Sequence, residues 1–225
     1  MSTRLSNMAS QNFANNPPLL RGWLHLGTSP IALIAGMVLV IIAPSISMRI
    51  AITIFTITSA ALFTVSATYH KIKWTPKWKS IFRRIDHANI LLIIAGTYTP
   101  LTLYWLNISQ ARNLLFFIWI GTILGLFFRI FWLNAPRLIY VIIYLLLGWA
   151  AIFYLPEFVS SAGWLIVSLI IMGGIFYSVG ALIYGLKRPK LSEKYFGFHE
   201  LFHSFTIAGY LAHYLAITLT VASMY

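Results

Sequence analysis

Three histidines in this chain, His70, His199 and His203, are candidates for metal ligands. His199 and His203 are four residues apart, so on a helix they lie one turn apart on the same face. That spacing presents two imidazoles to one ion, and a third imidazole with a water would complete an open tetrahedral zinc site of the catalytic kind. The chain contains no cysteine, which excludes disulfides, thiolate metal sites and a cysteine nucleophile.

Two further residues are candidates for chemistry beside such an ion. Ser66 comes one helical turn before His70, so its hydroxyl lies on the same stripe of the helix. Asp86 could hold a water by a hydrogen bond and either orient it or accept its proton. Zinc lowers the pKa of such a water to about 7. We therefore predict His70, His199 and His203 as metal ligands, with catalytic roles for Asp86 and Ser66.

These residues can meet only if the elements that carry them cross a membrane together. The chain is 60% hydrophobic and only 9% charged, whereas about a quarter of the residues in a soluble domain are charged. So few polar residues cannot cover a surface that faces water, which indicates that lipid is the solvent. The predicted fold class is therefore all-α, a polytopic membrane protein.

Apolar runs of about 20 residues, the length that spans a bilayer, recur along the chain and predict a seven-transmembrane-helix bundle over residues 23–225. A polar Ser/Asn-rich tail, residues 1–22, precedes it and is expected to be disordered or to lie on the membrane surface. The basic stretch Lys71–Arg84 is expected to be a loop. The predicted spans are approximately 23–43, 50–70, 88–106, 113–133, 138–155, 163–186 and 198–223.

The positive-inside rule orients this bundle. The tail and every second loop after it carry 14 of the 16 Lys and Arg residues, and the other loops carry only Arg49 and Arg112. The N-terminus is therefore expected in the cytoplasm and the C-terminus outside. Arg129, in the last turn of the fourth span, is expected to snorkel to the interface. Loop charges of this kind account for the net charge of +12, so nucleic acid is not expected as a partner.

This topology brings His70, Asp86, His199 and His203 to one depth on the cytoplasmic side. The metal prediction rests on that convergence, because a histidine pair four residues apart is a weak motif alone. Several single residues could have simpler roles. His25 and His87 are expected to be aromatic-belt or helix-capping residues. Asp86 could pair with Arg83 or Arg84. Glu200 lies about 100° around the helix from His199 and need not face the site.

The motifs themselves carry a resemblance to a known family. They are Ser66-Ala-Thr-Tyr-His70, then Arg84-Ile-Asp-His-Ala-Asn-Ile90 leading into Ala95-Gly-Thr-Tyr-Thr-Pro100, and His199-Glu-Leu-Phe-His203 followed by Ala208-Gly and His213. In order and separation they resemble the hemolysin III family, the bacterial branch of the progestin and adipoQ receptor superfamily.

The resemblance implies a seven-helix fold with a cytoplasmic N-terminus, in the plasma (inner) membrane of a bacterial cell. It also implies zinc bound by the family positions that match His70, His199 and His203. The family aspartate falls on Asp86 and the family serine on Ser66. His213 matches as well, but it lies about 15 Å along the helix from His203, too deep to join the same ion.

Three functions follow as hypotheses. The first is a zinc-dependent hydrolase of a lipid amide or related acyl bond, with membrane lipids as partners and a ceramidase-like activity as the resemblance suggests. The second is a pore, for which close helix contacts in an oligomer would use glycines of the sixth span: Gly173, Gly174, Gly180 and Gly185. The third is a membrane-homeostasis protein or sensor in which zinc is structural. The oligomeric state stays open.

Overall fold

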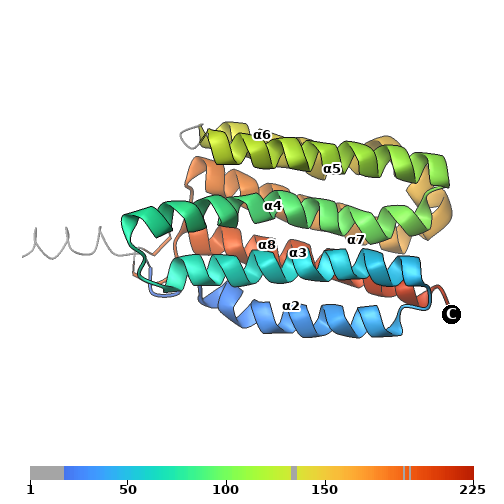
Figure 1. The fold of residues 1–225 in the computed structure, drawn as a ribbon, viewed down its shortest axis with the longest axis horizontal. Coiled ribbons are helices and arrows are strands. Elements are labelled where there is room, and N and C mark those ends of the chain that lie inside the picture. Colours follow the sequence, from blue (N-terminus) through green and yellow to red (C-terminus); the bar gives the residue numbers. More distant parts are fainter. Residues whose placement is uncertain (1–17, 133–135, 190, 193) are drawn as a thin grey trace, which may run out of the picture.

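The computed structural model describes residues 18–132, 136–189, 191–192 and 194–225, and within these ranges the regular structure is entirely helical. The helices lie roughly along one axis, and the C-terminus lies at the opposite end from the α3–α4 connection (Figure 1). Their bounds are α2 Trp23–Ile42, α3 Ile46–Lys71, α4 Pro76–Trp105, α5 Ile108–Phe131, α6 Arg137–Gly148, the 3-10 helix η1 Ala150–Tyr154, α7 Leu155–Leu186 and α8 Phe198–Ala222.

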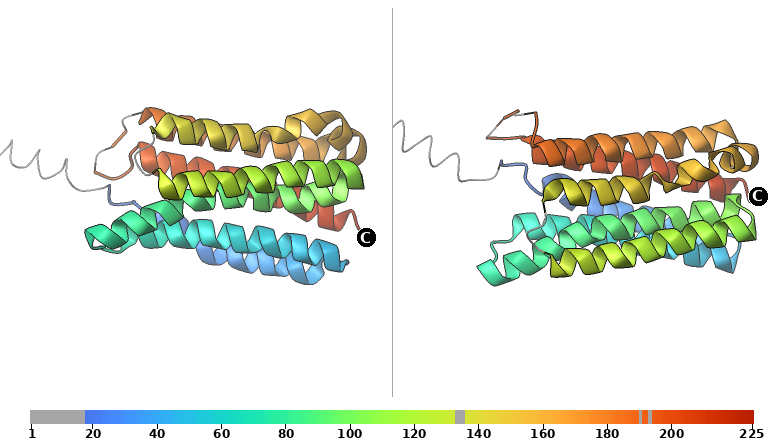
Figure 2. Two further views of the ribbon diagram at one scale, coloured as in Figure 1. Left: turned by 45° about the horizontal axis from the view of Figure 1, so that its top comes forward. Right: turned by 90° about the horizontal axis from the view of Figure 1, so that it is seen from above.

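Five helical segments of the described chain are long and apolar enough to cross a membrane: α2, α3, α5, the stretch Arg137–Leu186 and α8. The stretch Arg137–Leu186 contains α6, η1 and α7. Figure 2 shows α6 and α7 as two separate helices that are connected at one end. Gly163 interrupts α7 with a positive φ of 75°, a conformation that costs glycine little. The predicted start of the sixth span at residue 163 coincides with this break.

The start of α4 differs most from the prediction. The helix begins at Pro76, twelve residues before the predicted position 88, so most of the basic stretch expected as a loop is helical. Proline is favoured in the first helical turn because its missing N–H would have no partner there. This end of α4 projects beyond the neighbouring helices (Figure 1), so its charged residues need not enter the bundle.

The start of α5 also precedes the prediction, by five residues. Asn107 caps this helix, since its side chain accepts hydrogen bonds from the backbone N–H groups of Ser109 and Gln110 at 3.1 and 3.0 Å. Such a cap satisfies N–H groups that have no partner within the helix. The residues 107–112, expected as a boundary, therefore form the first turn of the helix.

Two hydrophobic clusters hold the bundle together, and α4 contributes to both. One joins α4 to α2, α3, α7 and α8, with Phe55 and Phe63 among its fully buried side chains. The other joins α4 to α5, α6, η1 and α7 around Leu91 and Ile118. The glycines of α7 were expected to permit close helix contacts in an oligomer. In the structure they lie against side chains from other parts of the same chain. Gly180, for example, lies against the Phe205 side chain.

Candidate metal site

The three predicted ligands lie together at one end of the bundle. His70 is in the last turn of α3, and His199 and His203 are in the first two turns of α8. One ring nitrogen from each lies within 4.8 Å of the others. The Nε2 atoms of His70 and His199 are 3.0 Å apart. His203 is buried, and the other two rings are partly exposed.

This spacing fits a zinc ion. Zinc binds imidazole nitrogen at about 2.0–2.1 Å in tetrahedral geometry, which places two ligand nitrogens about 3.3 Å apart. The separation of 3.0 Å between His70 and His199 is close to that value, and small side-chain rotations bring the third nitrogen to it. Three imidazoles also form a donor set of catalytic zinc sites. The group can therefore hold a metal ion.

His25 supports this cluster from α2. Its ring stacks on that of His203, with centroids 3.9 Å apart and planes 8° from parallel, and it meets Phe63 edge to face. His25 is only 2% exposed. The prediction of an aromatic-belt or capping role is therefore wrong, because the N-cap of α2 is Gly22 and the imidazole is buried against a predicted ligand. The stack restricts the orientation of the His203 ring.

The segment 18–22, expected to belong to a polar tail, packs across this end of the bundle. The backbone N–H of Leu19 donates to the Lys194 carbonyl at 3.0 Å, and the Arg21 guanidinium donates to the Glu200 carboxylate. Gly22 has a φ of +81°, and a Cβ there would lie 2.9 Å from the Cβ of His70. Only glycine suits this close approach.

Glu200 is committed to this contact. Its Oε2 accepts from the backbone N–H of Gly197 at 2.7 Å, which caps α8, and its other oxygen accepts from Arg21. The sequence His199-Glu200-Leu-Phe-His203 has the HExxH form of metalloproteases, in which the glutamate is the general base. Here both carboxylate oxygens are used elsewhere, so Glu200 is not available for that role.

Asp86 and Ser66 have a different setting. Both are buried, and both line a cavity that His199 and His203 also line. Across the described residues, the ion pair found between a carboxylate and Lys or Arg is Arg21–Glu200. The alternative in which Asp86 pairs with Arg83 or Arg84 is therefore not realised. Among the described residues no Lys or Arg forms an ion pair with the Asp86 carboxylate, and it lies where it can act on a molecule in the cavity.

Arg129 enters the bundle rather than reaching the interface. It is 5% exposed, donates to Nδ1 of His87, and lies over the Tyr140 ring at 4.3 Å. The snorkelling prediction is wrong, since the imidazole and the aromatic face bind the guanidinium inside the protein. Because Arg129 can only donate, Nε2 of a neutral His87 carries the hydrogen and donates to the Tyr184 hydroxyl at 2.9 Å. His87 is thus a partly buried residue that links Arg129 to Tyr184, rather than a belt residue.

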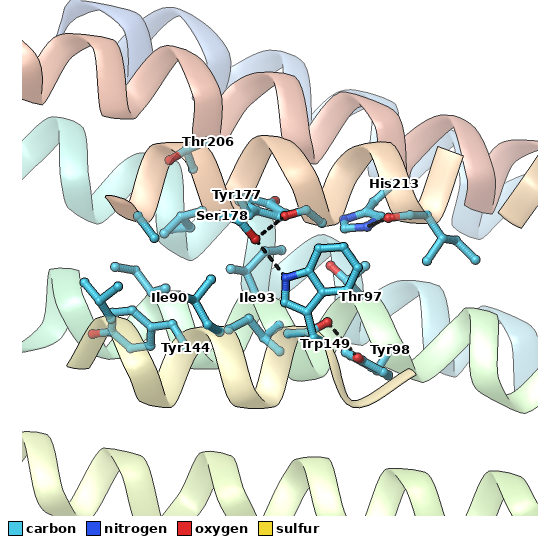
Figure 3. A pocket seen from close by; sticks show the side chains of 18 of the residues that line it. Ile90, Ile93, Thr97, Tyr98, Tyr144, Trp149, Tyr177, Ser178, Thr206 and His213 are labelled. Atoms are coloured by element: carbon cyan, nitrogen blue, oxygen red, sulfur yellow. Dashed lines mark hydrogen bonds between the residues drawn. The ribbon is translucent and has the colours of Figure 1, made fainter. Parts of the chain in front are cut away.

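The cavity extends from this site into the apolar interior. Its volume is about 260 Å³, and it reaches Leu101 and Leu155, near the end where α6 and α7 join. Most of its wall is apolar side chain, with Tyr98, Trp149 and Tyr177 among the aromatic residues (Figure 3). An apolar space whose wall includes His199 and His203 at one end suits a molecule that has an apolar chain and a polar head.

Comparison with known proteins identifies the family. The model of the haemolysin-III related family matches residues 13–214. The chain belongs to this family. It is 31% identical to Hemolysin-3 of Bacillus cereus over 214 residues, which cover 92% of the chain and 90% of the relative. It is 32% identical to a Hemolysin-3 homolog of Bacillus subtilis over 168 residues, 75% and 76% of the two chains.

A more distant relative of this haemolysin-III chain is the human monocyte to macrophage differentiation factor. It is 24% identical over 169 residues, which cover 70% of the chain and 64% of the relative. The family resemblance inferred from the three motifs is confirmed. Helices of membrane-spanning length and the family together identify a membrane protein.

Sequence reasoning missed two contributors to the site of this haemolysin-III protein. His25 lies on α2 and Arg129 on α5, far from the motifs. Both are polar residues inside apolar runs, and such residues usually have a partner or a function. That signal was present in the sequence, but the partners, His203 and His87, are identified by the packing of the helices.

Proposed function

We propose that this haemolysin III-type membrane protein binds zinc through His70, His199 and His203 and hydrolyses a lipid amide or a related acyl bond. The observation that carries the proposal is a group of three imidazoles with ligand atoms within 4.8 Å of one another, two of which, His199 and His203, line one end of an apolar cavity. A structural zinc normally has four protein ligands, so a three-histidine group favours the catalytic function.

The proposal includes seven membrane crossings, with α6 and α7 as separate spans and the metal site on the cytoplasmic side. The division of Lys and Arg residues between the two sides supports this orientation, because 13 lie on one side against 2 on the other when Arg129, buried in α5, is left out. The C-terminus at the end away from the α3–α4 connection is compatible with an odd number of crossings. Relatives from Bacillus support a bacterial plasma membrane as the location.

Two residues near the cluster, Asp86 and Ser66, have roles in this chemistry. Zinc, when bound, supplies Lewis acidity that polarises a carbonyl and lowers the pKa of a water to about 7. Asp86 orients that water and accepts its proton, since its carboxylate lines the cavity beside His199 and His203. Ser66, one turn before His70, donates a hydrogen bond to the oxygen that becomes negative as the carbonyl is attacked.

The cavity supplies binding and water exclusion. Its apolar wall fits the acyl chain of a membrane lipid, and burial of that chain holds the amide at the metal end. A lipid can reach such a cavity from the bilayer, so the partners are membrane lipids. Low polarity around the site also strengthens the interactions of Asp86 and Ser66 with the reacting atoms.

Metal content of the purified protein tests the ligand set. We expect about one zinc per chain in wild type, and almost none in His70→Ala and His203→Ala. The matched control is His213→Ala, a histidine on α8 outside the cluster, which should keep its zinc. Wild type prepared with zinc present but lacking metal would contradict the proposal.

Turnover tests the activity. Zinc-loaded protein in detergent is offered a panel of N-acyl lipid amides, and release of fatty acid is measured by mass spectrometry. We expect release by wild type and none above background by His203→Ala. If the protein binds zinc, hydrolyses none of these lipids and conducts ions in planar bilayers, the hydrolase proposal is contradicted and the pore hypothesis is favoured.

A further inference from the structure

His213 marks a second polar site in the same cavity. It lies ten residues after His203 on α8, about 15 Å further along the helix. The residue is 8% exposed, and its Nε2 donates to the Ile170 carbonyl at 3.1 Å. A neutral imidazole with hydrogen on Nε2 has a hydrogen-bond acceptor at Nδ1. In the described part of the chain, this buried Nδ1 has no partner.

Tyr177 of α7 lies beside it. The two ring centroids are 5.6 Å apart, and both residues line the cavity. The Tyr177 hydroxyl is buried and, across the described residues, also has no hydrogen-bond partner. Figure 3 shows His213 and Tyr177 along one side of the pocket, with Trp149 across from them. One of the two residues offers an acceptor, and the other offers a donor.

Paired glycines make room for the two rings. A Cβ at Gly173 of α7 would lie 2.5 Å from Nε2 of His213, and a Cβ at Gly209 of α8 would lie 3.0 Å from the Tyr177 ring. Each helix thus carries a glycine four residues before its polar aromatic residue, and each ring packs on the glycine of the other helix. Both rings are held in place by this packing, so the site exists before a ligand binds.

Neighbouring polar groups are already used. Trp149 Nε1 donates to the Ser178 hydroxyl at 2.8 Å, and the Tyr98 hydroxyl donates to the Gly148 carbonyl at 2.8 Å. The acceptor of His213 and the hydroxyl of Tyr177 have no partner among the described residues, and neither has the hydroxyl of Thr102, which also lines the cavity. Buried polar groups without partners are unfavourable and are rarely retained in native proteins. A ligand that enters the cavity can satisfy them.

We propose that His213 and Tyr177 bind a hydroxyl group carried on the acyl chain of the ligand, well away from its amide. A hydroxyl donates to Nδ1 of His213 and accepts from Tyr177, so it satisfies both atoms, whereas a carbonyl satisfies Tyr177 alone. This inference rests on the proposed function, because it places the acyl chain in the cavity. The site would select lipids with a hydroxylated chain.

Chain length sets the probe. An extended chain advances about 3.5 Å per three bonds, so 15 Å corresponds to about 13 bonds. About two of these lie before carbon 1, from the histidine site to the carboxylate oxygen and from that oxygen to carbon 1, so the hydroxyl is expected near carbon 12. Stearic acid and 12-hydroxystearic acid are product-type ligands that undergo no further hydrolysis. Their dissociation constants are measured by competition with a fluorescent fatty acid on zinc-loaded protein in detergent.

The ratio of the two dissociation constants, for stearic acid and for 12-hydroxystearic acid, tests the proposed hydroxyl site. We expect wild type to bind the hydroxylated acid about tenfold more tightly, and Tyr177→Phe to reduce the ratio to about one. The matched control is Tyr210→Phe. Tyr210 is also a buried tyrosine whose hydroxyl has no partner among the described residues, but it does not line the cavity. This variant should keep the tenfold ratio.

The outcomes separate the two proposals. Equal binding of both acids by wild type would overturn the hydroxyl site while leaving the acyl-chain cavity intact. A preference that survives in Tyr177→Phe would also overturn it. If wild type binds neither acid, the cavity does not take acyl chains, and the proposed function fails together with this inference.

Discussion

Two acidic residues, Glu200 and Asp86, are buried at the same end of the helical bundle, and their surroundings differ. Glu200 is 1% exposed and has both oxygens occupied, one by the Gly197 N–H and one by Arg21. Asp86 is 9% exposed and lines the cavity that His199 and His203 also line. One carboxylate closes the end of a helix, and the other is left for a ligand.

This difference shows that proximity in sequence is a poor guide to a catalytic role. Glu200 is adjacent to His199, but successive residues on a helix point about 100° apart, which turns its carboxylate toward the segment 18–22. Asp86 is on another helix, more than a hundred residues earlier, yet it lines the cavity with His199. Hydrogen-bond satisfaction, rather than the HExxH pattern, separates the structural carboxylate from the catalytic candidate.

The largest expected effect comes from Asp86→Asn. An amide cannot accept the proton from water, so we expect lipid amide hydrolysis to fall by about 10²–10⁴-fold. Zinc content should stay near that of wild type, because Asp86 is outside the ligand set. Metal analysis and fatty-acid release are measured on the same preparation. Near-normal turnover would show that Asp86 is not the base.

Glu200→Gln should produce a smaller effect, of another kind. The amide oxygen can still cap Gly197, but the charge opposite Arg21 is lost, which should cost about 1–3 kcal/mol of stability. For a chain of this size that corresponds to a thermal midpoint lower by about 2–12 °C. Turnover per bound zinc should remain close to wild type.

A double-variant cycle with Arg21→Gln sharpens this prediction. If the two side chains stabilise the protein mainly through each other, the double variant should be hardly less stable than either single variant. Midpoints are followed by intrinsic fluorescence in detergent. A loss of turnover in Glu200→Gln that matches the loss in Asp86→Asn would remove the distinction between the two carboxylates.

The smallest expected effect is at His25, which touches the site through ring stacking alone. His25→Phe retains an aromatic ring against His203, so zinc affinity should change by less than about threefold, whereas His25→Ala should weaken it by about tenfold or more. Competition with a chromophoric chelator measures both. A large loss in His25→Phe would mean that an imidazole nitrogen of His25, and not its ring face, supports the site.

Much of the architecture was predictable from composition and apolar runs, because apolar runs of about 20 residues cross lipid as helices, which satisfy all their backbone hydrogen bonds internally. The ends of α2 and α8 agree with prediction to within one residue. The start of α4 does not agree with prediction, because the basic part of this helix projects from the bundle and has no apolar pattern that would indicate a helix. The seven crossings and their orientation remain predictions.

For the site, the amino-acid sequence was enough to show which side chains could bind a metal, because the spacing of His199 and His203 and the order of the apolar runs follow from the chain alone. Helix packing determines which polar residues are occupied and which are free. Glu200 binds Arg21, His25 stacks on His203, and Arg129 turns inward to His87. These pairings join residues far apart in the sequence, and they depend on the rotation and depth of each helix, which are set by packing against its neighbours.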